Sequence, residues 1–149
     1  MPVAYESIKL APYLEVMVAD SDGMFCALVD EYLRLHRFEN IFLVTSEELV
    51  LWKLARRSFD IILLETCQEY KSIWENVIKG KYNTSLIVGV TFDRSGRSWL
   101  QAVRSGADAV LTKPFTHSRL AQALSDLLIS PASRRCKIVQ LPPALDMIR

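Results

Sequence analysis

The sequence predicts an α/β fold in which helices cover both faces of a parallel sheet. Apolar runs of strand length alternate with amphipathic stretches of helical length five times along the chain. Parallel strands need crossover connections and are buried on both faces, so this alternation favours βα units over an all-β fold or a helical bundle. The 149 residues are the size of one domain, and half of them are hydrophobic.

The five strands are expected in short apolar runs bounded by polar residues. They are predicted at residues 13–19, 40–45, 59–65, 85–91 and 108–112. The first and third of these runs each end in carboxylates, Asp20 and Glu65.

Helices are predicted between and after these strands, at residues 22–36, 47–57, 69–79, 97–105 and 117–129. Asp22 is suited to cap the first helix, and Gly106 marks the end of the fourth. The apolar stripes expected to face the core are Phe25, Leu28, Val29, Tyr32 and Leu35; Val50, Leu51 and Leu54; Leu100, Val103 and Ala107; and Leu120, Leu124, Leu127 and Leu128.

The two ends of the chain are less regular. Residues 1–12 are expected to be an N-terminal extension, residues 13–130 the domain, and residues 131–149 a C-terminal tail. Pro142-Pro143 argue against a further helix or central strand in the tail. The basic cluster at residues 134–137 is interpreted as solvated, and a contact site for an acidic partner is the alternative.

Composition narrows the class of function. The net charge of +1 argues against a nucleic-acid-binding protein, and no apolar run is long enough to span a membrane. The start lacks a secretory signal, so a cytoplasmic location is expected. Three cysteines and two histidines without metal-ligand spacing predict no metal centre; these are Cys26, Cys67, Cys136, His36 and His117.

Polar residues at successive strand ends predict a pocket. Asp20, Ser21 and Asp22 follow the first strand, Glu65 ends the third and Thr91 ends the fourth; Lys113-Pro114 follow the fifth. In open parallel sheets, ligands bind outside the carboxyl ends of the strands, where the strand order reverses.

This order of residues resembles the receiver domain of bacterial two-component response regulators. The strongest match is the segment Gly106-Ala107-Asp108-Ala109-Val110-Leu111-Thr112-Lys113-Pro114-Phe115. The resemblance covers residues 13–129 and implies a flavodoxin-like, doubly wound, three-layer α/β/α sandwich with strand order 2-1-3-4-5. It also implies a single-domain signalling protein in phosphorelay signal transduction, not an enzyme. Its partners are then a histidine kinase, a regulator or an effector.

The same resemblance assigns roles to the pocket residues. Asp20 matches the first acid of the Mg²⁺-binding pair in receivers, and Glu65 stands where receivers have the aspartate that accepts a phosphoryl group. Thr91 matches the hydroxyl that moves toward the phosphate. Lys113 matches the lysine that pairs with the acceptor, and the peptide before Pro114 is expected to be cis.

Four departures fall on the switching machinery. Ser21 replaces the second metal-binding carboxylate, Val110 replaces an aromatic, and the loop at residues 66–72 lacks the usual Met-Pro and Asp-Gly. Glu65 is one methylene longer than aspartate, and an error of about 1 Å at a reacting centre can cost roughly 10²-fold in rate. The loss of a carboxylate at Ser21 should weaken Mg²⁺ binding.

These departures predict a pseudo-receiver that acts mainly through phosphorylation-independent protein contacts. No cofactor is expected, although weak Mg²⁺ binding at Asp20 and Glu65 stays open. One alternative is a working Mg²⁺-dependent regulator that uses Asp20, Asp22 and Glu65. Another is a small-ligand module at the same crevice, although the chain has no Gly-rich phosphate loop.

A partner surface is expected around the fourth helix and the fifth strand, with Trp99 and Val110 as candidates. Tryptophan is typical of binding hot spots. Partial burial of Trp99 against a neighbouring helix is the alternative, and a homodimer through this surface is left open.

Overall fold

A single parallel sheet organises the protein. The structure is a computed structural model that describes residues 8–67, 70–78, 85–92 and 96–129. Five strands, β1 (Glu15–Ala19), β2 (Asn40–Val44), β3 (Ile61–Glu65), β4 (Leu86–Thr91) and β5 (Ala109–Thr112), lie in the order β2-β1-β3-β4-β5. The predicted fold class and strand order are therefore confirmed.

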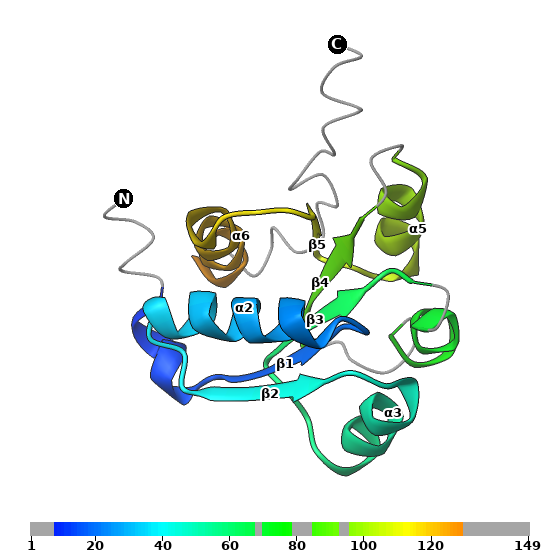
Figure 1. Ribbon diagram of the computed structural model, residues 1–149, viewed down its shortest axis with the longest axis horizontal. Coiled ribbons are helices and arrows are strands. Elements are labelled where there is room, and N and C mark those ends of the chain that lie inside the picture. The colour runs from blue at the N-terminus through cyan, green and yellow to red at the C-terminus, as the bar shows by residue number, and fades with distance from the viewer. Residues whose placement is uncertain (1–7, 68–69, 79–84, 93–95, 130–149) are drawn as a thin grey trace.

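Helices cover both faces of this sheet (Figure 1). One face carries α2 (Gly23–Leu35) and α6 (His117–Ile129), and the other carries α3 (Glu47–Arg56), the π-helix η3 (Ile73–Ile78) and α5 (Arg97–Ser105). A 3-10 helix, η1 (Ile8–Tyr13), precedes β1 and packs near α6. The buried Ala11 joins η1 to the core, so the predicted extension is in part a packed element.

Alternate residues of each strand enter two separate hydrophobic clusters. In β1, Val16 and Val18 pack toward α2 and α6, whereas Met17 and Ala19 pack toward α3, η3 and α5. All four side chains are at most 1% exposed, because a parallel sheet between two helical layers has no solvent face. This double burial explains why the strands are continuous apolar runs in the sequence.

Helix boundaries agree closely with the expected ones except at the third helix, and the buried faces of α2, α3 and α5 differ from the expected ones. In α2 the buried residues are Cys26, Val29 and Leu33, while Leu28 and Leu35 are exposed. These buried residues are three and four apart, so they lie on one face of the helix. The predicted stripe shares Val29 with this face but is rotated about the helix axis away from Cys26 and Leu33. In α3 only Val50 and Leu54 are buried, and the predicted Leu51 is 36% exposed.

The third helix is the largest local difference. An α-helix was expected at 69–79, and the structure instead has a π-helix from Ile73 to Ile78. In this wider turn, Trp74 lies in the core and its Nε1–H donates to the Glu65 carbonyl oxygen at 2.9 Å. Such turns are rare and occur often at functional sites. The predicted tail at 131–149, with its basic cluster, lies outside the described residues.

Two caps match their predictions. The Asp22 carboxylate accepts hydrogen bonds from the backbone N–H groups of Met24 and Phe25 at 3.0 and 3.3 Å. Gly106 ends α5 with φ of 115°, which is readily available to glycine. Among the described residues, no helix is long and apolar enough to cross a membrane.

Candidate functional site: a charged pocket at the strand ends

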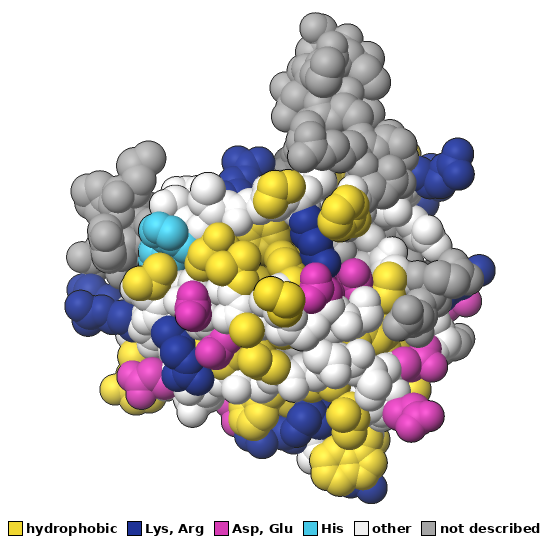
Figure 2. Space-filling view, in the orientation of Figure 1, with side chains coloured by type: hydrophobic (Ala, Val, Ile, Leu, Met, Phe, Trp, Pro, Cys, Tyr) yellow, Lys and Arg dark blue, Asp and Glu magenta, His cyan; other side chains and the backbone are white. Residues whose placement is uncertain are grey.

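The sheet brings three charged side chains from separate strands together. Asp20 follows β1, Glu65 ends the adjacent β3, and Lys113 follows β5. The Lys113-Pro114 peptide is cis, as expected, and the Lys113 N–H donates to the Thr91 carbonyl oxygen at 2.8 Å. Figure 2 shows acidic and basic side chains side by side near the middle of this face.

Lys113 is the positive centre of the pocket. Its Nζ lies 2.9 Å from Asp20 Oδ2 and 3.4 Å from Glu65 Oε2. The same ammonium lies 4.0 Å from the centroid of the Phe25 ring, whose negative face favours a cation. The expected pairing of Lys113 with Glu65 is therefore present, a second pairing with Asp20 accompanies it, and the lysine joins the ends of β1, β3 and β5.

Glu65 also reaches across to the loop after β1. Its Oε1 accepts hydrogen bonds from the Ser21 N–H at 2.9 Å and from Ser21 Oγ at 2.8 Å. The longer carboxylate and the shorter hydroxyl are thus complementary, because an acid at position 21 would face Glu65 with like charge. Together the two unusual residues close a hydrogen-bonded contact between β1 and β3.

The two remaining acids are held by local backbone groups. Asp20 is 1% exposed, and its Oδ1 accepts the Asp22 N–H at 2.9 Å. Asp22 itself is exposed and bonds to the first turn of α2, so it acts as the predicted helix cap. Asp20 and Glu65 therefore contact Lys113, whereas Asp22 does not.

Burial and charge move the pKa values in the pocket in different directions. Burial raises the pKa of Asp20, and this outweighs the hydrogen bond from Asp22 and the charge of Lys113. Burial alone would raise the pKa of Glu65, but the two Ser21 hydrogen bonds and Lys113 lower it overall. Burial would lower the pKa of Lys113, yet Asp20 and Glu65 raise it, so the lysine remains charged at neutral pH.

Asp20 and Glu65, the carboxylates considered for weak Mg²⁺ binding, are engaged by protein groups in this structure. The ion prefers near-octahedral oxygen ligands, usually with several waters and one or two accessible carboxylates. Here the oxygens of Asp20 and Glu65 bond to Lys113, to Ser21 and to the backbone of Asp22. In the described part of the chain, no three His, Cys, Asp or Glu residues are grouped as a metal site would need.

The candidate partner residues are buried, which corrects an expectation. Trp99 is 5% exposed and Val110 is 2% exposed, and both belong to the cluster on the α5 side of the sheet. Trp99 and Ala102, three residues apart, face the sheet, whereas Leu100 is 43% exposed instead of lying in the core. Neither Trp99 nor Val110 is therefore available for docking. Thr91 is also fully buried.

Three contributors to the pocket were not predicted from the sequence. Phe25 packs over Lys113, Trp74 bonds to the Glu65 carbonyl, and the Cys67 side chain hydrogen-bonds to Glu65. Phe25 follows the capping residue by one helical turn, which is a signal that places it near the strand end. Trp74 and Cys67 carry no comparable signal, because their positions depend on the course of the chain after β3.

Comparisons with known proteins agree with this geometry at the level of the fold. No family model and no curated protein sequence matches the chain. Among solved structures, the BeF3-activated receiver domain of DrrB from Thermotoga maritima matches with a TM-score of 0.67 at 21% identity, over 78% of this chain and 98% of that one. A two-component response regulator from Clostridium difficile gives 0.69 at 24% identity, over 79% and 98%.

A chemotaxis response regulator, CheY4 of Vibrio cholerae, matches with a TM-score of 0.66 at 19% identity, over 77% of this chain and 98% of that one. In these three structures the match spans nearly the whole of the solved domain. The protein therefore has the fold of the receiver domains of response regulators.

Proposed function

We propose that this protein is a receiver-like signalling protein that works through contacts with other proteins and without phosphorylation of Glu65. The observation that carries the proposal is the closed network of Asp20, Lys113, Glu65 and Ser21. A phosphoryl acceptor needs a free carboxylate oxygen, a metal ion and an in-line donor. Both oxygens of Glu65 are already bonded to protein groups.

The network also suits a role as a permanent connection. It joins the loops after β1 and β5 to the end of β3 through groups that are mostly buried. Breaking a buried ion pair by removing one partner typically lowers the free energy of unfolding by about 3–5 kcal/mol. We therefore expect the network to stay closed in the folded protein. Glu65 carries about one negative charge, against roughly two for a phosphoryl group, so it is a poor copy of a phosphorylated aspartate.

The proposed role requires no catalytic step and no cofactor. Its partners belong to the classes that the receiver resemblance implies, namely histidine kinases, regulators and effectors. A fixed pocket supports docking that does not depend on a chemical signal at Glu65.

Phosphodonor labelling tests the proposal. We expect no phosphoryl adduct on the wild-type protein after incubation with acetyl phosphate and Mg²⁺, measured by intact mass spectrometry. The double variant Ser21→Asp/Glu65→Asp restores both acids that receivers use and serves as the gain-of-function comparison. A phosphoryl group mapped to Glu65 of the wild type contradicts the proposal.

The working-regulator alternative makes a separate prediction. Under that alternative, Mg²⁺ at about millimolar concentration changes the tryptophan fluorescence, because Trp74 bonds to the Glu65 carbonyl. Under our proposal the fluorescence stays constant over this range. A copurifying nucleotide or chromophore would instead favour the small-ligand alternative.

A further inference from the structure

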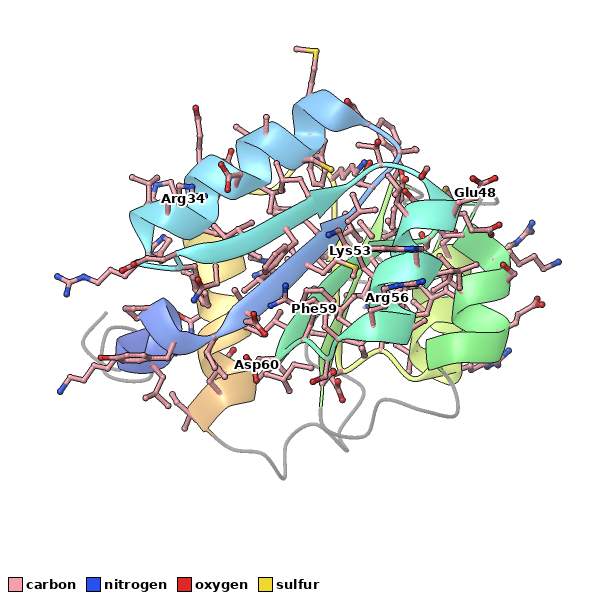
Figure 3. The ribbon with its side chains drawn as sticks, turned by 90° about the horizontal axis from the view of Figure 1, so that it is seen from below. Arg34, Glu48, Lys53, Arg56, Phe59 and Asp60 are labelled. Carbon is pink, nitrogen blue, oxygen red and sulfur yellow. The ribbon has the colours of Figure 1, made fainter. Side chains whose placement is uncertain are left out.

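A second charged surface lies at the opposite end of the sheet from the pocket. A groove is lined by Glu15, Trp52, Lys53, Arg56, Arg57 and Ser58, and we call it the Trp52 surface. Glu15 begins β1 and Ser58 precedes β3, so the groove is at the amino ends of the strands. Figure 3 shows Lys53 and Arg56 on α3, and Phe59 and Asp60 in the segment just before β3.

Aromatic rings hold the cations of this surface in place. The Arg56 guanidinium lies 4.1 Å from the centroid of the Trp52 ring, and its Nη1 donates to the Trp52 carbonyl oxygen at 3.2 Å. Arg57 stacks on the Phe42 ring at 4.4 Å, and Lys53 lies 5.4 Å from the same ring. These contacts reduce the freedom of long side chains before any partner arrives, which lowers the entropic cost of binding.

The apolar part of the surface is exposed. Trp52 is 52% exposed, and Leu49, one helical turn earlier on α3, is 50% exposed. In Figure 2 hydrophobic and basic side chains lie together at the lower edge, over α3. Tryptophan and arginine are the residues most enriched at binding hot spots. The core does not use Trp52, because α3 packs on the sheet through Val50 and Leu54.

The charges of the groove are unbalanced. Three cations line it against one carboxylate, Glu15, and that carboxylate is paired with Arg57. Within the described ranges, neither Lys53 nor Arg56 forms an ion pair with an acidic side chain. The groove therefore offers two positive charges next to an exposed indole ring, and it favours a partner that brings carboxylates and an apolar side chain.

We infer that the Trp52 surface docks an acidic segment of a protein partner. An apolar side chain of that segment packs on Trp52 and Leu49, and its carboxylates pair with Lys53 and Arg56. Arginine is suited to a bidentate pair with a carboxylate. The inference rests on the proposed function, since it supplies the docking surface of a protein that acts through protein contacts.

Nucleic acid fits this surface less well. Binding to a nucleic-acid backbone requires the neutralisation of many phosphates, and the groove has only three cations on a protein of net charge +1.

The position of the Trp52 surface separates it from the pocket, because it shares no residue with Asp20, Glu65 and Lys113. Docking there does not need any event at Glu65.

Selection from a random peptide library displayed on phage, with the full-length protein as bait, tests the inference. We expect the enriched peptides to be rich in Asp and Glu and to contain an aromatic or aliphatic residue. Labelled copies are then titrated by fluorescence polarisation. Trp52→Ala and Arg56→Glu should each weaken binding by about tenfold or more, and binding should weaken as salt rises.

Two variants on α2, away from the Trp52 surface, serve as matched controls for these substitutions. Leu35→Ala removes an exposed apolar side chain, and Arg34→Glu reverses an exposed charge. Both should bind the peptides within about twofold of the wild type, a difference of roughly 0.4 kcal/mol. Circular dichroism checks that all four variants remain folded, which the exposure of these side chains predicts.

Several outcomes overturn the inference. They are the absence of any enriched peptide, enrichment without an excess of acids, and unchanged binding to Trp52→Ala and Arg56→Glu. Tighter, Trp52-dependent binding of an oligouridylate than of the peptides would make the surface a nucleic-acid site instead.

Repeating the titration with acetyl phosphate and Mg²⁺ separates this inference from the proposed function. If phosphodonor changes the affinity while the Trp52 dependence persists, the surface stands and phosphorylation independence fails. If the peptides bind Trp52→Ala and Arg56→Glu as tightly as the wild type and no adduct forms on Glu65, the docking inference is wrong and the proposed function stands.

Discussion

At the scale of the residue, the pocket depends on the pairing of a longer acid with a shorter hydroxyl. Ser21 donates from both its N–H and its Oγ to the same oxygen of Glu65. Taken singly, either residue looks like the loss of a receiver function. Taken together, they form one contact, in which the second carboxylate oxygen remains for Lys113.

Replacing Ser21 by alanine tests this contact through its pH dependence. The pKa of Glu65 is lowered in the folded protein, so ionised Glu65 stabilises the fold above its unfolded pKa. That contribution disappears as the pH falls through the lowered, folded pKa. We expect Ser21→Ala to raise the pKa of Glu65 and to reduce the free energy of unfolding by about 1 kcal/mol at pH 7.

The difference between wild type and Ser21→Ala should vanish in acid, below the folded pKa of Glu65. Urea unfolding as a function of pH measures the free energy, and NMR of the Glu65 side-chain carboxyl carbon follows the titration. Ser21→Thr keeps the hydroxyl and is the control. A stability difference that is equally large in acid would show that the Oγ contact is not electrostatic.

At the scale of the element, a glycine in β4 sets how closely α5 and η3 approach the sheet. A Cβ added at Gly89 would lie 3.2 Å from the Ala102 Cβ and 3.4 Å from the Trp74 Cη2. Both neighbours are in the core on that face of the sheet. The position of Trp74, and so its bond to the Glu65 carbonyl, depends on the absence of a side chain at residue 89.

Gly89→Ala should destabilise the protein by about 1–3 kcal/mol, because the indole or α5 must move outward. Trp74 fluorescence should change as well, since its Nε1–H bond lengthens. Gly23→Ala is the control: its added Cβ meets Thr45 Cγ2 at 3.9 Å, and alanine favours the helix that begins there. Equal midpoints of urea unfolding for Gly89→Ala and wild type would contradict the close approach.

At the scale of the whole molecule, two hydrophobic clusters share one sheet. Each of β1, β3, β4 and β5 contributes residues to both clusters, so neither helical layer has a core of its own. The pocket lies at one end of this sheet and the Trp52 surface at the other. The charged pocket and the Trp52 surface are therefore separate features of a common scaffold.

The shared sheet predicts one cooperative unfolding transition. Trp74 and Trp99 report the cluster beneath η3 and α5, whereas far-UV circular dichroism reports all the helices. We expect the two signals to give the same urea midpoint, as a two-state domain does. Trp52→Phe removes the exposed indole, so that fluorescence reports the buried side only. A fluorescence transition that precedes the loss of helix would contradict this prediction.

Much of the fold was predictable because it rests on local signals. Double burial makes each strand an apolar run, and Asp22 and Gly106 mark helix ends through their own backbone chemistry. The rotation of a helix is harder to predict, since several residues next to the buried stripe are also apolar. For this reason the pattern predicts core positions for Leu28, Leu51 and Leu100, which are exposed, and leaves Trp99 between a partner surface and burial.

The sequence by itself determined the parallel sheet, the positions of its strands and the presence of two acids and a lysine at their ends. These features follow from hydrophobic period and from residue order, which any chain of this pattern carries. Only the tertiary structure decided that Glu65 bonds to Ser21, that Trp99 is buried and that Trp52 is exposed among cations. The physical reason is that each depends on side chains far apart in the chain or on the rotation of a helix against the sheet, and local pattern specifies neither.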